Sequence, residues 1–375
     1  MKNVMIFLLI LVVFTACTPR KQVQYSKKDS PVISANSCPL VTKNISILKN
    51  KKKAVRILSI DGGGVKGIIP ARIVAEFENR SGKPACELFD LMVGTSTGGL
   101  VVLALATPNE SGQPKYKASD ILDLYMQKSK DIFYASMFRK IYTGFGLWGP
   151  KYDRSQYDKI LIGLFGNTRM SQLINPTAVT SYNLDTNLPQ VWTRKQALKD
   201  PNNDFLISNI AAASSAAPIF FAPKLLTNAY NNSSYQVDGG MFASNPELTA
   251  ANLAYELDDT LTQKDIVLIS LGTGLTKLGI ESKDLCKSGV IGWILKANLI
   301  SGMMQAQGLY NAELGEIYGN SCRLQFELDK KTSAMDNASK ANLLALLKLT
   351  EDYINANSDL IDQIISILLN TSPNY

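Results

Sequence analysis

The sequence predicts an α/β fold around a mostly parallel sheet, and three observations support this prediction. Two stretches rich in β-branched and apolar residues, "AVRILSI" (54–60) and "LFDLMV" (88–93), have the composition of buried strands. Each runs into a glycine-rich turn that is followed by apolar residues at helical spacing. The chain has 375 residues, 46% of them hydrophobic and 19% charged, which suits one large globular domain.

The first strand leads directly into "DGGGVKG", residues 61–67. Consecutive glycines let the backbone turn several N–H groups toward one point. The next segment, 68–81, has helical spacing and should end at Gly82. The glycine loop is therefore expected at a helix N-terminus, where an anion is stabilised.

The second strand runs into "GTSTG", residues 94–98, and a small-residue helix is expected over 98–106. Strand, sharp turn and helix in this order predict a nucleophile elbow with Ser96 at its apex. Two successive strand–helix units imply a parallel sheet.

Later segments extend the same architecture. Strands are expected over 175–184, 190–194 and 265–271, and a short one ends at Asp238 before two glycines. A helix of small residues should begin at Ile207 and stop near Pro218. Residues 342–370 predict two amphipathic helices, broken near 357–358, that pack on the domain.

The chain contains no histidine, which excludes a Ser-His-Asp triad, a Cys-His pair and histidine-ligated metal sites. A base for Ser96 must then be a carboxylate or a lysine. Asp238 is the candidate, because it ends a strand and two glycines let other backbone approach it. A free aspartate has a pKa near 3.9, about three units below an ideal base at pH 7, and burial would raise it. The alternative for Asp238 is a residue that only stabilises a turn.

The N-terminus predicts export and a lipid anchor. Lys2 precedes an apolar run over 4–14, too short to span a bilayer, and "FTAC" leads to Cys17 like the lipobox of bacterial lipoproteins. We therefore expect a signal peptide over 1–16, a lipidated Cys17 with a basic tether over 17–53, and a catalytic domain over 54–375. The alternative is an ordinary signal peptide cleaved nearby.

The basic tether is expected either to lie against anionic lipid headgroups or simply to aid solubility. Its lysines are not interleaved with aromatic residues, so nucleic acid is not expected as a partner. Cys38, Cys86, Cys286 and Cys322 show no CxxC spacing, so no metal site is expected and any disulfide pairing stays open. Cys86 is expected to be a buried small hydrophobic residue.

The blocks "DGGGVKG", "GTSTG" and "DGG", in this order, resemble those of the patatin-like phospholipases. Further blocks, "PKYDRSQYDKIL", "ASSAAPIFFAP" and "DNASKANLLALLKL", are similar to segments of that family, so the resemblance covers roughly residues 54–350. It implies a patatin-like three-layer α/β/α fold with a central, mostly parallel sheet.

For the site, the resemblance implies Ser96 as nucleophile, Asp238 as sole base, and an oxyanion hole of Gly62, Gly63 and Gly64. Lys66 stands at the motif's basic position, as a candidate anion contact or as the partner of a carboxylate. The implied activity is that of a lipid acyl hydrolase of the phospholipase A type. It would cleave phospholipids or related acyl lipids through an acyl-enzyme, without metal or cofactor.

Two other functions stay open from the sequence. One is an acyltransferase that uses the same dyad, and the other is a non-catalytic lipoprotein that binds lipid or a partner. A phosphate cradle at the glycine loop is disfavoured, because the loop lacks the ending of a P-loop and Asp61 would repel a phosphate. The expected location is the bacterial cell envelope, as a membrane-anchored lipoprotein. Thr18 after Cys17 favours the outer membrane where the host has one.

Overall fold

A computed structural model describes residues 38–43, 54–276, 289, 292, 299–315 and 320–371. Residue contacts divide the chain into two units, 1–34 with 278–302 and 35–277 with 303–375. The elements below belong to the second unit, except that α15 begins at Leu299.

The second unit is built on an eight-stranded sheet with the order β5-β6-β3-β2-β1-β7-β9, to which β4 adds by pairing with β3. The neighbours from β3 to β9 run parallel, whereas β4 and β6 run antiparallel to β3, and β5 antiparallel to β6. The strands are β1 Val55–Ile60, β2 Leu91–Thr95, β3 Thr177–Asn183, β4 Leu188–Thr193, β5 Lys224–Thr227, β6 Ser233–Asp238, β7 Ile266–Leu271 and β9 Ser321–Leu324, beside a small sheet of β8 Leu275–Thr276 and β10 Glu327–Leu328.

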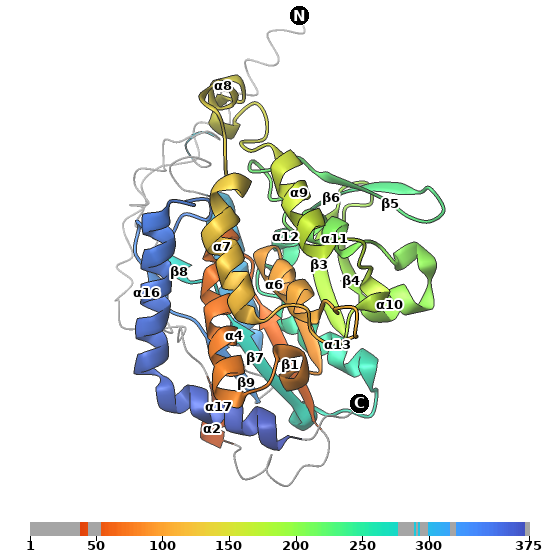
Figure 1. Cartoon of the computed structure of the whole chain (residues 1–375), viewed down its shortest axis with the longest axis vertical. Coiled ribbons are helices and arrows are strands. Elements are labelled where there is room, and N and C mark those ends of the chain that lie inside the picture. Colours follow the sequence, from red (N-terminus) through yellow and green to blue (C-terminus); the bar gives the residue numbers. More distant parts are fainter. Residues whose placement is uncertain are drawn as a thin grey trace, which may run out of the picture. The chain divides into compact units, whose positions relative to one another are not determined.

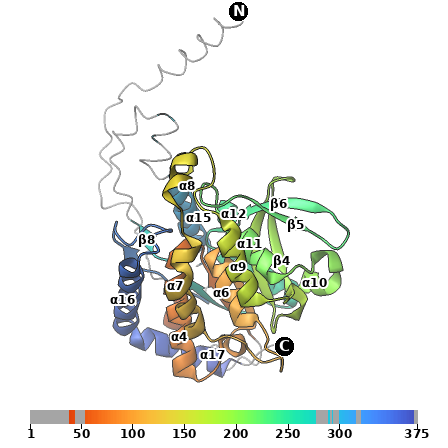
Figure 2. The ribbon, with the colours of Figure 1, turned by 45° about the horizontal axis from the view of Figure 1, so that its top comes forward.

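Helices cover both faces of this sheet (Figures 1 and 2). The larger apolar layer contains Leu58 and Ile60 of β1, and the other face packs Val55 and Ile57 of β1 against α13. This alternation follows from the period of two in a strand. The helices are α2 Pro39–Lys43, α4 Ile68–Ser81, α5 Ala85–Leu88, α6 Thr97–Ala106, α7 Ala118–Ile132, α8 Met137–Tyr142, α9 Arg154–Phe165, α10 Arg194–Lys199, α11 Ile207–Ser214, α12 Gly240–Ala243, α13 Glu247–Leu257, α15 Leu299–Gly315, α16 Lys340–Ala356 and α17 Ser358–Asn370.

The predicted three-layer α/β/α fold with a mostly parallel sheet is confirmed. Helix α4 ends where the sequence indicated, because Gly82 adopts the left-handed conformation (φ 69°) that closes many helices. The C-terminal pair, α16 and α17, breaks at Asn357 as expected. No helix among the described residues is both long and apolar enough to cross a bilayer.

One strand boundary was wrong. The stretch over 88–93 was expected to be one strand, but Leu88 ends the short helix α5 and β2 begins only at Leu91. Between them Asp90 accepts hydrogen bonds from the Arg56 backbone amide (2.9 Å) and guanidinium (2.7 Å). This buried ion pair holds Asp90 at the start of the strand. Cys86, on α5, is half-buried and its thiol is free.

Part of the segment expected to be a tether is built into the domain. Residues 39–43 form α2, and Leu40 is fully buried in the larger apolar layer. Cys38 forms a disulfide with Cys322 of β9, which closes a sequence separation of 284 residues. The predicted signal peptide and Cys17 lie outside the described residues.

Candidate active site

Strand β3 brings Ser96 and Asp238 together. Strand β2 pairs with β3 up to the pair of Thr95 and Thr180. On the same edge, the next residue of β3, Ser181, pairs with Asp238 of β6. Because β6 runs antiparallel to β3, the carboxyl ends of β2 and β6 meet head to head on that edge. Ser96 follows β2 directly, so it lies beside Asp238.

Ser96 occupies the apex of a strained turn. Its φ of 54° and ψ of −118° are rare for a residue with a side chain, and α6 begins at the next residue. The turn is tight enough that a Cβ at Gly98 would lie 2.2 Å from the Ile60 carbonyl oxygen. The amide of Ser96 donates to Ser214 Oγ at 2.7 Å, which fixes the turn against α11.

Asp238 is buried at the end of β6, with only 2% of its surface exposed. Burial raises the pKa of Asp238 to about 6, although the nearby Ser96 side chain and the hydrogen bond from the Gly240 amide lower it. The Gly240 amide donates to Asp238 Oδ1 at 2.7 Å. No cation of the described residues is among the groups that shift this pKa.

The glycine loop runs past Ser96. A Cβ at Gly62 would lie 3.3 Å from Ser96 Cβ, so the loop backbone packs directly against the elbow. The Gly62 amide already donates to the Ser244 carbonyl (2.9 Å). By contrast, Gly63 and Gly64 line the pocket at Ser96, and neither amide donates to another backbone carbonyl within the described ranges. Of the three glycines expected to form an oxyanion hole, these two have amides available.

Gly64 is required where it stands. Its φ is 61°, and a Cβ there would lie 2.2 Å from the Met335 carbonyl oxygen. That same carbonyl accepts the Val65 amide at 2.8 Å and so holds the loop in place.

Asp61 and Lys66 of the loop have a separate electrostatic environment. Asp61 is buried and makes a bidentate ion pair with Arg323 of β9, including a contact of 2.8 Å to Oδ1. Lys66 is buried too, and burial lowers its pKa to about 8 while attraction to Asp61 raises it. Lys66 is not among the residues that line the pocket at Ser96.

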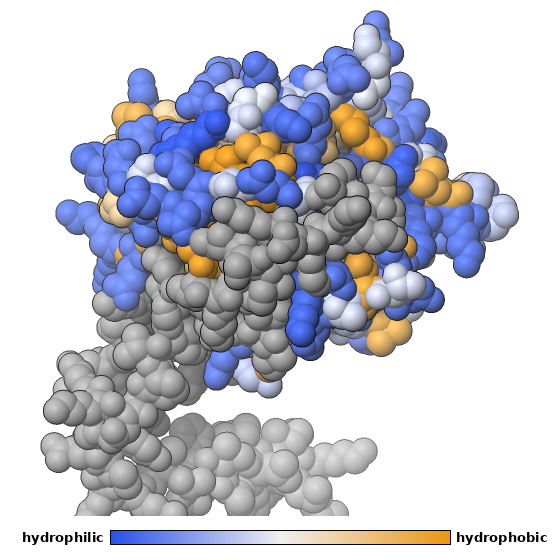
Figure 3. Space-filling view, turned by 90° about the horizontal axis from the view of Figure 1, so that it is seen from below, coloured by the Kyte–Doolittle hydropathy of each residue, from blue (hydrophilic) through white to orange (hydrophobic). Residues whose placement is uncertain are grey.

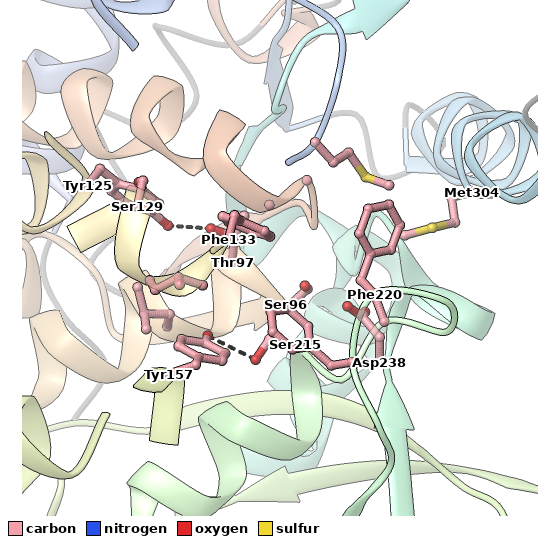
Figure 4. A pocket seen from close by; sticks show the side chains of 17 residues that line it. Ser96, Thr97, Tyr125, Ser129, Phe133, Tyr157, Ser215, Phe220, Asp238 and Met304 are labelled. Carbon is pink, nitrogen blue, oxygen red and sulfur yellow. Dashed lines mark hydrogen bonds between the residues drawn. The ribbon is translucent and has the colours of Figure 1, made fainter. Parts of the chain in front are cut away.

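Ser96 and Asp238 face a largely apolar pocket, whose empty space of about 670 Å³ includes part of the open solvent at its mouth (Figure 4). Four other hydroxyls in it are paired with each other: Thr97 with Tyr125, and Ser215 with Tyr157 at 2.9 Å. The pocket is lined by Gly63, Gly64, Ser96, Thr97, Leu100, Tyr125, Ser129, Ile132, Phe133, Tyr157, Ser215, Ala217, Phe220, Phe221, Asp238, Met304 and Met335. Its composition suits a long apolar ligand with one polar group at Ser96.

Sequence reasoning missed the residues that hold this site. No local pattern assigns a role to Ser214 or Arg323, although Ser214 lies in "ASSAAPIFFAP", one of the blocks on which the family resemblance rests. In the part of the chain that the structure describes, no cluster of histidine, cysteine, aspartate and glutamate could hold a metal ion.

Comparison with known proteins identifies the family of this chain. The family model described as patatin-like phospholipase matches residues 58–251. The chain is 32% identical to Patatin-T5 of Solanum tuberosum over 333 residues, 80% of this chain and 83% of the relative. It is 31% identical to Patatin-04/09 of the same plant, over 81% of this chain and 84% of the relative. The crystal structure of VipD from Legionella pneumophila aligns with 81% of this chain and 67% of its own, at 13% identity and a TM-score of 0.33. On the family model and the patatin relatives, this chain belongs to the patatin-like phospholipase family.

Proposed function

We propose that this protein hydrolyses acyl esters of phospholipids or related lipids, as a phospholipase A, through a dyad of Ser96 and Asp238. Membership of the patatin-like phospholipase family supports a lipid acyl hydrolase in general. The observation that carries the specific proposal is that Ser96, at the apex of the turn, and a buried Asp238 line the same pocket, where the nearby Ser96 side chain lowers the Asp238 pKa. The chain's lack of histidine leaves a carboxylate as the base.

The proposed reaction has two steps. Ser96 Oγ attacks the ester carbonyl and gives its proton to Asp238, and the released alcohol takes that proton as the acyl-enzyme forms. Water then attacks the acyl-enzyme, Asp238 accepts one of its protons, and the fatty acid leaves as that proton returns to Ser96 Oγ. The negative charge on the carbonyl oxygen would be stabilised by the Gly63 and Gly64 amides.

The raised pKa supports Asp238 as the base. A value of about 6 lies closer to neutral pH than that of a free aspartate, which makes proton transfer from serine less unfavourable. The carboxylate is nevertheless ionised at pH 7 and can accept a proton. No ion pair has to break for Asp238 to accept this proton.

The test follows fatty acid release from phospholipid, with chelator present, for wild type, Ser96→Ala and Ser129→Ala. Ser129 is a matched control, because it is also a buried serine that lines the pocket. We expect turnover without metal, its loss only in Ser96→Ala, and a fluorophosphonate adduct that mass spectrometry locates on Ser96. A wild type without turnover on any ester would instead favour the non-catalytic lipoprotein.

We also propose that the protein is an envelope lipoprotein acylated at Cys17. The disulfide between Cys38 and Cys322 supports export, because such bonds persist in oxidising compartments. Mass spectrometry of the N-terminal peptide after membrane extraction tests this proposal. A mature chain that begins elsewhere, without an acyl group, would contradict it.

A further inference from the structure

Residues 134–150, between α7 and α9, form a projecting segment that we call the apolar loop. It contains α8 and the short 3-10 turn Gly144–Gly146, and α8 stands at the end of α7 in both ribbon views (Figures 1 and 2). Of the twenty large apolar side chains exposed among the described residues, eight lie in this loop, with exposures of 43% to 79%. They are Tyr134, Met137, Phe138, Ile141, Tyr142, Phe145, Leu147 and Trp148.

Such a concentration is unusual for a protein surface. Scattered single apolar residues are ordinary, as on the face in Figure 3, where the described residues are mostly hydrophilic and the apolar patches are small. In the apolar loop, by contrast, a six-residue helix contains no buried residue at all. Among the described residues, nothing covers this helix.

The loop is held in shape by polar contacts at its base. The Arg139 guanidinium donates to the carbonyl oxygens of Pro150 (3.2 Å) and Tyr152 (2.8 Å). Thr143 is buried, and its carbonyl accepts the amide of Trp148 at 3.0 Å. The exposed aromatic side chains thus extend from a fixed backbone.

The base of the loop is part of the pocket wall. The rings of Phe133 and Tyr152, which bracket the loop, meet edge to face with centroids 5.4 Å apart. Phe133 lines the pocket, and Tyr152 stacks on pocket-lining Phe220 with centroids 6.4 Å apart. The amide of Tyr152 also donates to the Phe220 carbonyl at 2.9 Å. Whatever receives the loop therefore lies next to the pocket.

The charge around the loop is positive. Residues 128–152 contain five basic residues and one acidic residue, Asp131. Arg139 lies 3.9 Å from Asp153 and Lys151 pairs with Asp336, whereas Lys128 and Lys130 are exposed near the C-terminal end of α7. Exposed lysines beside apolar side chains favour an anionic lipid surface.

We propose that the apolar loop docks this protein on a lipid bilayer that carries anionic headgroups, and that it does so without the N-terminal anchor. A protein partner would cover one side of a helix. The large side chains of α8 are all exposed and none is buried. A fluid medium that surrounds them, such as a bilayer, therefore fits this helix better than a protein partner does. Tyrosine and tryptophan are enriched at membrane interfaces, where one end of the ring is apolar and the other wet. Docking brings the pocket to the bilayer, where an acyl chain would enter it. This consequence rests on the proposed function.

The test uses the full chain with Cys17→Ser, so that no acyl anchor can form. Sedimentation with vesicles of phosphatidylcholine and phosphatidylglycerol measures binding of this protein and of two double variants. Phe138→Ser/Trp148→Ser removes two exposed side chains of the loop, and Leu188→Ser/Leu198→Ser removes two side chains that are each 59% exposed elsewhere. We expect the loop variant to bind vesicles at least about tenfold more weakly, and the control to bind as before.

Activity separates docking from catalysis. We expect the loop variant to hydrolyse a short, water-soluble ester at the wild-type rate and vesicle phospholipid more slowly. The proposal is overturned if the loop variant binds vesicles as well as the parent protein does. It is also overturned if the parent protein is a dimer, and the loop variant but not the control becomes a monomer that still binds vesicles. If wild type hydrolyses neither substrate but still binds vesicles through the loop, the docking surface stands and the proposed function fails.

Discussion

Two aspartates at strand ends, Asp61 after β1 and Asp238 at the end of β6, are both buried, yet their surroundings differ. Asp61 faces a bidentate guanidinium from Arg323. Burial raises its pKa, and Arg323 lowers it. Asp238 accepts a hydrogen bond from the Gly240 amide and lies near the Ser96 side chain, and burial raises its pKa to about 6.

This difference separates a structural carboxylate from one suited to proton transfer. The Arg323 guanidinium stabilises the ionised form of Asp61 against the effect of burial and ties the glycine loop to β9. A carboxylate without a cation changes its protonation at modest cost, because no ion pair has to break. The Asp61 pair should therefore matter for stability, and Asp238 for activity.

The largest expected effect is on activity, from Asp238→Asn. The amide cannot accept the proton of Ser96, so we expect kcat on a soluble ester to fall at least about a thousandfold. Tyr157→Phe is the matched control, because it removes another buried hydroxyl group of the pocket and should cost less than about tenfold. An Asp238→Asn variant that keeps a tenth of the wild-type rate would remove Asp238 from the mechanism.

The next effect is on stability, from Arg323→Met. It leaves Asp61 charged and buried without its partner, so we expect the free energy of unfolding to fall by about 3–5 kcal/mol in urea titrations. Adding Asp61→Asn to this variant should restore part of the loss, because the buried charge of Asp61 is then gone, while buried Glu247 still lacks the attraction of Arg323. A loss below about 1 kcal/mol in the single variant would show that the pair is not structural.

The raised pKa of Asp238 gives opposite pH dependences for activity and stability. The rate constant kcat/KM should rise with pH and level off above about 6, because only the ionised carboxylate accepts a proton. Between the unfolded pKa near 4 and the folded value near 6, the folded state binds more protons, so stability falls as pH rises through this window.

Asp238→Asn lacks this titration. Relative to wild type, the variant should gain up to about 3 kcal/mol of unfolding free energy between pH 4 and pH 7, measured by denaturant unfolding at each pH. Parallel stability curves for the two proteins would mean that the Asp238 pKa is not raised by folding.

The sequence predicted the parts of this site that depend on local pattern. Ser96 and Asp238 could be identified because a strand, a glycine turn and a helix leave signals within a few residues. Their proximity could not be derived in the same way, since it depends on β6 running antiparallel along the β3 edge that β2 also uses. Partners from distant segments, such as Ser214 for the Ser96 amide and Arg323 for Asp61, depend on the same tertiary pairing.

The apolar loop shows a different limit. Its aromatic residues are visible in the sequence, but a helix with this composition is normally buried, and only its position at the end of α7 leaves it exposed. Likewise, the stretch at Leu88 has strand-like composition, and the contact of Asp90 with Arg56 decides that the strand starts later.

The smallest expected effect is from Lys66→Met, and it decides between the two roles that the sequence left open for this lysine. If Lys66 belongs to the charges around Asp61, its removal relieves a buried charge and loses one attraction, so stability should change by within about 1 kcal/mol. Activity on a soluble ester should then stay within about threefold, because Lys66 does not line the pocket. A hundredfold loss of activity at unchanged stability would instead make Lys66 an anion contact, and would join the two aspartate environments into one functional site.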